Sequence, residues 1–177
     1  MQKLFSNFVL IIATVLTFML AQILPCQAIT FDFIWKGNGS YSAKGSFSYD
    51  ESTAPKSFSE KGKGATNVLK SFDISFFDSQ NNLSATYNNV VNSISNTNFF
   101  KFNFNTATQE IFGEIDLGGE IVGDTYLSGT VNNNLSLFKV PRSGSDLIID
   151  SNPGSVAAKP VPEASVSSHS SKSPSQL

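Results

Sequence analysis

Acidic side chains between residues 110 and 124 are the part of this chain best suited to chemistry. Two carboxylates facing each other across a cleft, about 5–10 Å apart, can hydrolyse a glycosidic bond. Glu114 and Asp116 would share the solvated face of one strand, a placement that ordinary solubility also produces. We keep a glycosidase as a remote alternative and assign no catalytic residue; the candidates are Glu110, Glu114, Asp116, Glu120 and Asp124.

The single histidine and the single cysteine limit other chemistry. His169 lies near the C-terminus and Cys26 in the N-terminal apolar segment, so neither suits the positioned Ser-His-Asp or Cys-His arrangement that nucleophilic catalysis needs. One cysteine excludes an intramolecular disulfide and a zinc site with two or more thiolates. We therefore predict a protein that is not an enzyme.

Segment 116–124 could offer carboxylate and carbonyl oxygens to calcium. It lacks the close Asp-x-Asp spacing of dedicated calcium loops. A hairpin connection with solvated acids is the interpretation that we favour. We predict no metal-binding and no cofactor-binding residue.

Four aromatic residues are out of phase with the apolar stripes of their predicted strands. They allow two interpretations: an exposed platform for sugar rings, or strand ends and a second packed layer. Exposed apolar patches usually mark a binding partner, so the first interpretation predicts a carbohydrate-binding module. The residues are Phe77, Phe99, Phe112 and Tyr126.

The elements that must position these side chains are antiparallel β-strands over residues 29–140. Bulky and small polar residues alternate with period two, which is typical of sheets with one buried and one solvated face. Residues 51–66 are predicted to form a longer surface loop. About seven to nine short strands at this spacing indicate a single all-β domain, either a sandwich or a partly closed barrel. The clearest stripes are Phe31-Phe33-Trp35, Phe72-Ile74-Phe76 and Phe100-Phe102-Phe104.

Residues 1–28 have the pattern of a secretory signal peptide: Lys3, a 17-residue run from Phe8 to Leu24, and a small-residue exit ending at Ala28. Cleavage after Ala28 predicts a secreted protein, extracellular or periplasmic. Two alternatives stay open. An uncleaved segment would remain a membrane anchor, and Cys26 would be the site of a lipid.

Residues 141–177 are rich in proline and serine, and we predict a disordered tail. From Asp150 onward no apolar run exceeds Val156-Ala157-Ala158. A spanning helix needs about 20 apolar residues, so we expect no C-terminal membrane anchor.

Composition narrows the function classes further. The chain has 177 residues, a formal net charge of −2 and only 15% charged residues. Phosphate recognition requires clustered lysine and arginine, which this chain lacks. We therefore exclude nucleic acid as a partner and expect a single domain.

Two short motifs resemble those of cyanobacterial PEP-CTERM exported β proteins. Gly45–Thr53, GSFSYDEST, is similar to the G-x-F-x-Y-D strand and turn of such domains, and Val161–Ser165, VPEAS, is similar to their sorting signal. Ala164 replaces the second proline, and neither an apolar span nor a basic cluster follows. The resemblance therefore implies a degenerate sorting signal, from a truncated or frameshifted gene.

The resemblance and the missing catalytic groups together predict a non-catalytic structural or adhesive domain of the cell surface or extracellular matrix. A carbohydrate-binding module that uses exposed aromatic residues is the alternative, with extracellular polysaccharide as its partner.

Overall fold

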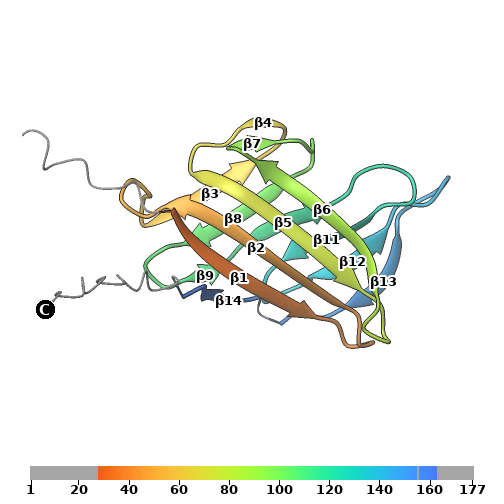
Figure 1. Ribbon diagram of the computed structural model, residues 1–177. Helices are drawn as coiled ribbons and strands as arrows, with labels where there is room; N and C mark the ends of the chain where they lie inside the picture. Colours follow the sequence, from red (N-terminus) through yellow and green to blue (C-terminus); the bar gives the residue numbers. More distant parts are fainter. Residues whose placement is uncertain (1–27, 155, 163–177) are drawn as a thin grey trace, which may run out of the picture.

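The computed structural model describes residues 28–154 and 156–162, and all of their regular structure is β-strand (Figure 1). Most of the predicted signal peptide, Cys26, Glu163–Ser165 of the sorting-like motif and His169 lie outside the described residues. Within the described part, no helix is long and apolar enough to cross a membrane.

In the described part of the chain, fourteen strands form two antiparallel sheets that do not close into a barrel. Sheet A contains, in spatial order, β14 (Ala157–Pro160), β1 (Ala28–Lys36), β2 (Ser42–Asp50), β5 (Leu69–Phe77), β6 (Leu83–Val91), β7 (Ile94–Ser95) and β4 (Gly64–Ala65). Sheet B contains β13 (Leu147–Ser151), β12 (Ser136–Lys139), β11 (Thr125–Thr130), β10 (Glu114–Gly118), β8 (Lys101–Asn105) and β3 (Ser57–Lys61), with β9 (Glu110–Ile111) paired to β8. The predicted all-β antiparallel fold is confirmed, and its architecture is the sandwich.

The core between the sheets consists largely of phenylalanine rings. Phe31, Phe47 and Phe72 lie opposite one another on β1, β2 and β5. The ring centroid of Phe47 lies 4.8 Å from that of Phe102 and 4.8 Å from that of Phe104, both on β8 of sheet B. Burying each ring contributes about 1.5–3 kcal/mol, and tilted or edge-to-face pairs add about 0.5–1.5 kcal/mol. The alternating stripes of the sequence therefore become the interface between the layers.

Polar side chains join the two sheets around this aromatic core. Asn89 of β6 is 1% exposed, and its amide exchanges two hydrogen bonds with the backbone of Gly118 in β10, at 2.7 and 3.0 Å. Glu60 of β3 is 4% exposed and accepts backbone N–H bonds from Val68 at 2.6 Å and Leu69 at 3.3 Å. These buried groups are hydrogen-bonded, as buried polar groups in proteins usually are. Polar contacts therefore hold the two sheets together in addition to the apolar core.

The strands continue beyond residue 140, where the sequence predicts a disordered tail. β13 pairs with β12, and β14 pairs with β1. The Asp150 carboxylate accepts backbone N–H bonds from Gly39 and Tyr41 in the turn between β1 and β2, and Val156 is 4% exposed. The prediction of disorder is therefore wrong for residues 147–151 and 157–160. Backbone pairing and the Asp150 carboxylate hold these segments, whose apolar residues form no buried stripe: Leu147 and Ile148 are 58% and 64% exposed.

The predicted surface loop over residues 51–66 also contains strands. Phe58 and Glu60 of β3 point inward at alternate positions, and β3 pairs along its whole length with β8. β4 pairs with β7. The sequence did not reveal β3, because prolines, glycines and lysines dominate this segment and only Phe58 of β3 is an apolar residue facing the core.

Candidate functional site

Glu114 and Asp116 share the outer face of β10, as the sequence predicts. Lys101 of β8 donates a hydrogen bond of 2.8 Å from its Nζ to Glu114 Oε1 and forms a salt bridge there. Asp116 lies opposite Lys101 and Ser128, and Ser128 Oγ donates to its Oδ2 at 3.1 Å. Burial raises the pKa of Asp116 to about 6, although the Ser128 hydrogen bond and the charge of Lys101 act in the opposite direction.

The other candidate carboxylates do not join this pair. Glu120 accepts hydrogen bonds from the backbone N–H and the side-chain amide of Asn98, both at 2.7 Å. Asp124 Oδ2 accepts the backbone N–H groups of Glu120 and Ile121, each at 3.0 Å. Glu110 is exposed in β9. These contacts give Glu120 and Asp124 roles in holding loops.

Segment 116–124 is the end of β10 and the connection to β11, which confirms the hairpin. Its acids are not all solvated, because Asp116 and Asp124 are partly buried. Among the described residues, no group of three or more His, Cys, Asp and Glu side chains is placed to hold a metal ion.

The four out-of-phase aromatic residues lie on different parts of the molecule. Phe77 lies on the outer face of sheet A, whereas Tyr126 is on the outer face of sheet B. Phe112 follows β9 and is 40% exposed, and Phe99 precedes β8 and is 64% exposed. The structure therefore does not bring all four rings together.

Tyr126 has a partner that the sequence analysis missed. Its ring stacks on that of Phe138 in β12, with centroids 4.9 Å apart and planes 12° from parallel. Its hydroxyl donates to Asp146 Oδ2 at 2.6 Å, and burial together with this carboxylate raises the pKa of Tyr126. Phe138 also departs from the phase of Leu135 and Leu137, and that was the available signal.

A shallow groove of about 490 Å³, here called the sheet-B groove, lies on the outer face of sheet B beside Phe112. Gly113 directly follows Phe112 and lies between β9 and β10. Its φ is 66°, a conformation that glycine adopts at low cost. Asn103 Nδ2 donates to the backbone oxygen of Glu114 at 2.6 Å and is thereby held at the groove. The principal side chains of its lining are Ser59, Lys61, Lys101, Asn103, Phe112 and Glu114.

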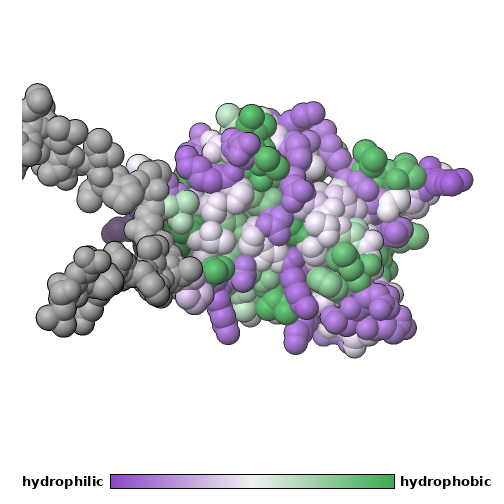
Figure 2. Space-filling view, viewed as in Figure 1, coloured by the Kyte–Doolittle hydropathy of each residue, from purple (hydrophilic) through white to green (hydrophobic). Residues whose placement is uncertain are grey.

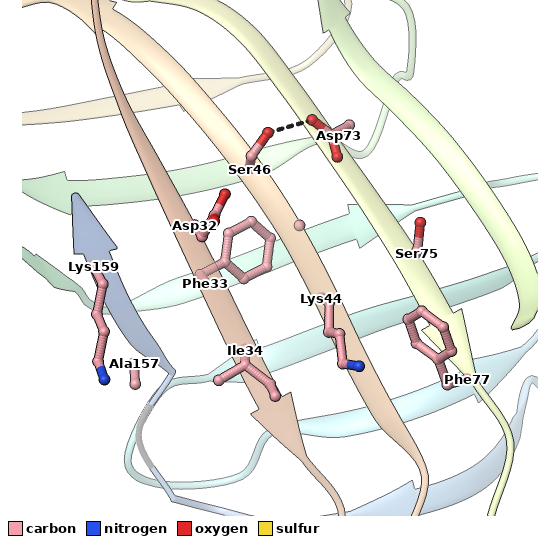
Figure 3. A pocket seen from close by; sticks show the side chains of 11 residues that line it. Asp32, Phe33, Ile34, Lys44, Ser46, Asp73, Ser75, Phe77, Ala157 and Lys159 are labelled. Atoms are coloured by element: carbon pink, nitrogen blue, oxygen red, sulfur yellow. Dashed lines mark hydrogen bonds between the residues drawn. The ribbon is translucent and has the colours of Figure 1, made fainter. Parts of the chain in front are cut away.

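A larger depression of about 600 Å³, here called the sheet-A groove, lies on the outer face of sheet A (Figure 3). A Cβ at Gly45 would overlap the backbone oxygen of Asp73 and the ring of Phe33, so glycine allows this ring to approach the backbone of β2. Lys44 Nζ lies 4.6 Å from the ring centroid of Phe77. Ser46 Oγ donates to Asp73 Oδ2 at 2.6 Å, the contact dashed in Figure 3.

Comparison with known proteins gives no match to a family model, a curated protein or a solved structure.

Proposed function

We propose that the protein is a non-catalytic, exported structural and adhesive domain of the cell surface or extracellular matrix that binds polysaccharide. The observation that carries the proposal is the sheet-B groove, where the exposed ring of Phe112 lies beside polar side chains. An aromatic ring packs against the apolar face of a sugar, while neighbouring polar groups bond its hydroxyls.

The contacts of the carboxylates support a binding role. Glu120 and Asp124 stabilise loops, and Glu114 is paired with Lys101. A groove on a sheet face suits a chain-like ligand that runs across several strands. Adhesion through such a surface requires affinity and no bond cleavage.

Export is proposed from the pattern of residues 1–28. Ala28 is the first residue of β1 and pairs with Asp50, so cleavage after Ala28 would leave the remainder of β1 attached to β2. Fractionation of expressing cells, with N-terminal sequencing of the product, tests this proposal. A soluble product starting at Ile29 agrees with it, and a membrane-bound product starting at Met1 shows an anchor.

The binding test compares two phenylalanine variants on a panel of cellulose, xylan, mannan and galactomannan. Phe112→Ala removes the ring of the sheet-B groove and should weaken binding about tenfold, which corresponds to about 1.4 kcal/mol. Phe99→Ala is the matched control, because Phe99 is more exposed and does not line the groove. Equal binding by the wild type and Phe112→Ala would remove the proposal's main support.

One observation favours glycoside hydrolysis as a second candidate. The raised pKa of Asp116 suits a general acid, and Glu114 lies two residues away on the same face. Release of reducing ends from the same polysaccharides measures this activity. Steady hydrolysis that is lost in both Glu114→Gln and Asp116→Asn would replace the non-catalytic proposal.

A further inference from the structure

We infer that the sheet-A groove is a second polysaccharide site, so that one molecule binds two chains on opposite sides of the sandwich and links them. The inference rests on the proposed function of the sheet-B groove. The sheet-A groove is lined from β14, β1, β2 and β5, and the sheet-B groove from β3, β8, β10 and the Phe112 turn. The outer faces of two packed sheets point in opposite directions.

The sheet-A groove has an apolar floor within a polar surface. Gly45, the edge of the Phe33 ring and Ile34 form this floor, and Phe77 stands at one side (Figure 3). Figure 2 shows the surrounding face, where hydrophilic residues alternate with small hydrophobic areas. The absence of a Cβ at Gly45 lets the Phe33 ring pack close beneath β2, and Lys44 lies over the Phe77 ring.

Charged and hydroxyl groups alternate across the strands that form the groove. Lys159 lies opposite Asp32, Asp32 opposite Ser46, and Ser46 opposite Asp73. In the next row Ile34 lies opposite Lys44, and Lys44 opposite Ser75. Neighbouring strands are about 4.8 Å apart, so hydrogen-bond donors and acceptors recur at that interval across the sheet.

This pattern selects a neutral, hydroxyl-rich chain. Two lysines and two aspartates line the groove, and their formal charges cancel. Asp32 and Asp73 would repel a polyanion, and Lys44 and Lys159 would repel a polycation. Sugar hydroxyls both donate and accept, so they can use every one of these groups. Among the described residues, neither Lys44 nor Lys159 forms an ion pair within 4 Å.

The test separates binding from linking. Wild type, Phe77→Ala, Phe112→Ala and the double variant are measured for binding to a surface coated with galactomannan. The same proteins are then mixed with soluble galactomannan, and light scattering reports linked chains. Val91→Ala is the control for Phe77→Ala, since Val91 is 48% exposed on β6 of the same sheet and does not line the groove.

We expect each single variant to bind the coated surface about tenfold more weakly than the wild type and to lose the rise in scattering. The double variant should lose both, while Val91→Ala should behave as the wild type. Scattering by Phe77→Ala equal to that of the wild type overturns the inference and leaves the proposed function intact. Absence of wild-type binding overturns the proposed function as well. Thermal unfolding of each variant shows that the fold is retained.

A second arm uses alginate, an acidic polysaccharide, with Phe112→Ala, in which only the sheet-A groove remains. Galactomannan should bind this variant at least tenfold more tightly than alginate does. Equal binding of the two polymers would contradict a neutral ligand.

Discussion

The outer faces of sheet A and sheet B arise from the same alternation of bulky and polar residues, yet the charged side chains on them differ in burial. On sheet B, Asp116 is partly buried between Lys101 and Ser128, and its pKa is raised to about 6. On sheet A, Asp32 and Lys44 are exposed around an open groove. A charged residue at an outward position is therefore not automatically a solvated one.

Aromatic residues account for much of this contrast. Tyr126 lies opposite Gly118, diagonal to Asp116, and stacks on Phe138. These rings cover part of the outer face of sheet B. On sheet A the aromatic contribution is limited to Phe77 at one side of the groove and the buried Phe33 at its floor. The difference in charge burial thus follows from the rings beside Asp116, which sheet A lacks around Asp32.

The largest expected effect is a loss of stability that involves both sheets. Phe47 is fully buried and its ring contacts Phe102 and Phe104 across the sandwich. Phe47→Ala should lower the free energy of unfolding by about 3–5 kcal/mol, because a cavity replaces the ring. Urea unfolding measures this change. A loss below 1 kcal/mol would show that the two sheets do not depend on this contact.

A smaller effect should be specific to sheet A. Gly45→Ala places a Cβ against Asp73 and the Phe33 ring, and such overpacking costs about 1–3 kcal/mol. Binding through the sheet-B groove should persist, as measured by galactomannan binding of Gly45→Ala against Gly45→Ala/Phe112→Ala. Ser48→Ala on the same strand is the control and should cost less, since it removes only the hydrogen bond to Ser71. An unchanged urea midpoint for Gly45→Ala would contradict the packing of Phe33.

The smallest effect distinguishes sheet B by its pH dependence. Because burial raises the pKa of Asp116 to about 6, the folded protein binds this proton more tightly than the unfolded chain does. Ionisation therefore lowers stability as pH rises from about 4 to about 6. Asp116→Asn should raise the free energy of unfolding at pH 7 by about 1 kcal/mol. This figure already includes a reduction for solvent screening, because Asp116 is only partly buried.

The pH prediction has an independent check. NMR titration of the Asp116 carboxyl carbon should give a midpoint near 6, and Ser128→Ala should move it higher, since the Ser128 hydroxyl stabilises the ionised form. A midpoint near 4 in the wild type would place this carboxylate in open solvent.

The sequence was sufficient for the core and for the inward or outward direction of most strands. Phe31, Phe33 and Trp35 are buried as their spacing predicts, because period two maps directly onto the two faces of a strand. β13 and β14 escaped prediction because backbone pairing and the Asp150 carboxylate, rather than an apolar stripe, hold them.

The two grooves could not be predicted from the sequence, because strand pairing brings their residues together. Asp32 and Lys159 are neighbours only because β14 pairs with β1. Phe112 and Lys61 line the same groove only because β9 and β3 both pair with β8. The exposure of Phe112 was foreseeable from its phase. Its separation from Phe77, on the opposite sheet, required the strand order.

The central claim is that both outer faces bind polysaccharide, and NMR titration of the protein with galactomannan oligosaccharides tests it most directly. Backbone amide shifts should change in two separate groups, one around Phe112–Glu114 and one around Lys44–Ser46 and Ser75–Phe77. Phe112→Ala should abolish the first group and leave the second. Shift changes confined to one face, or to loops outside both grooves, would contradict the account.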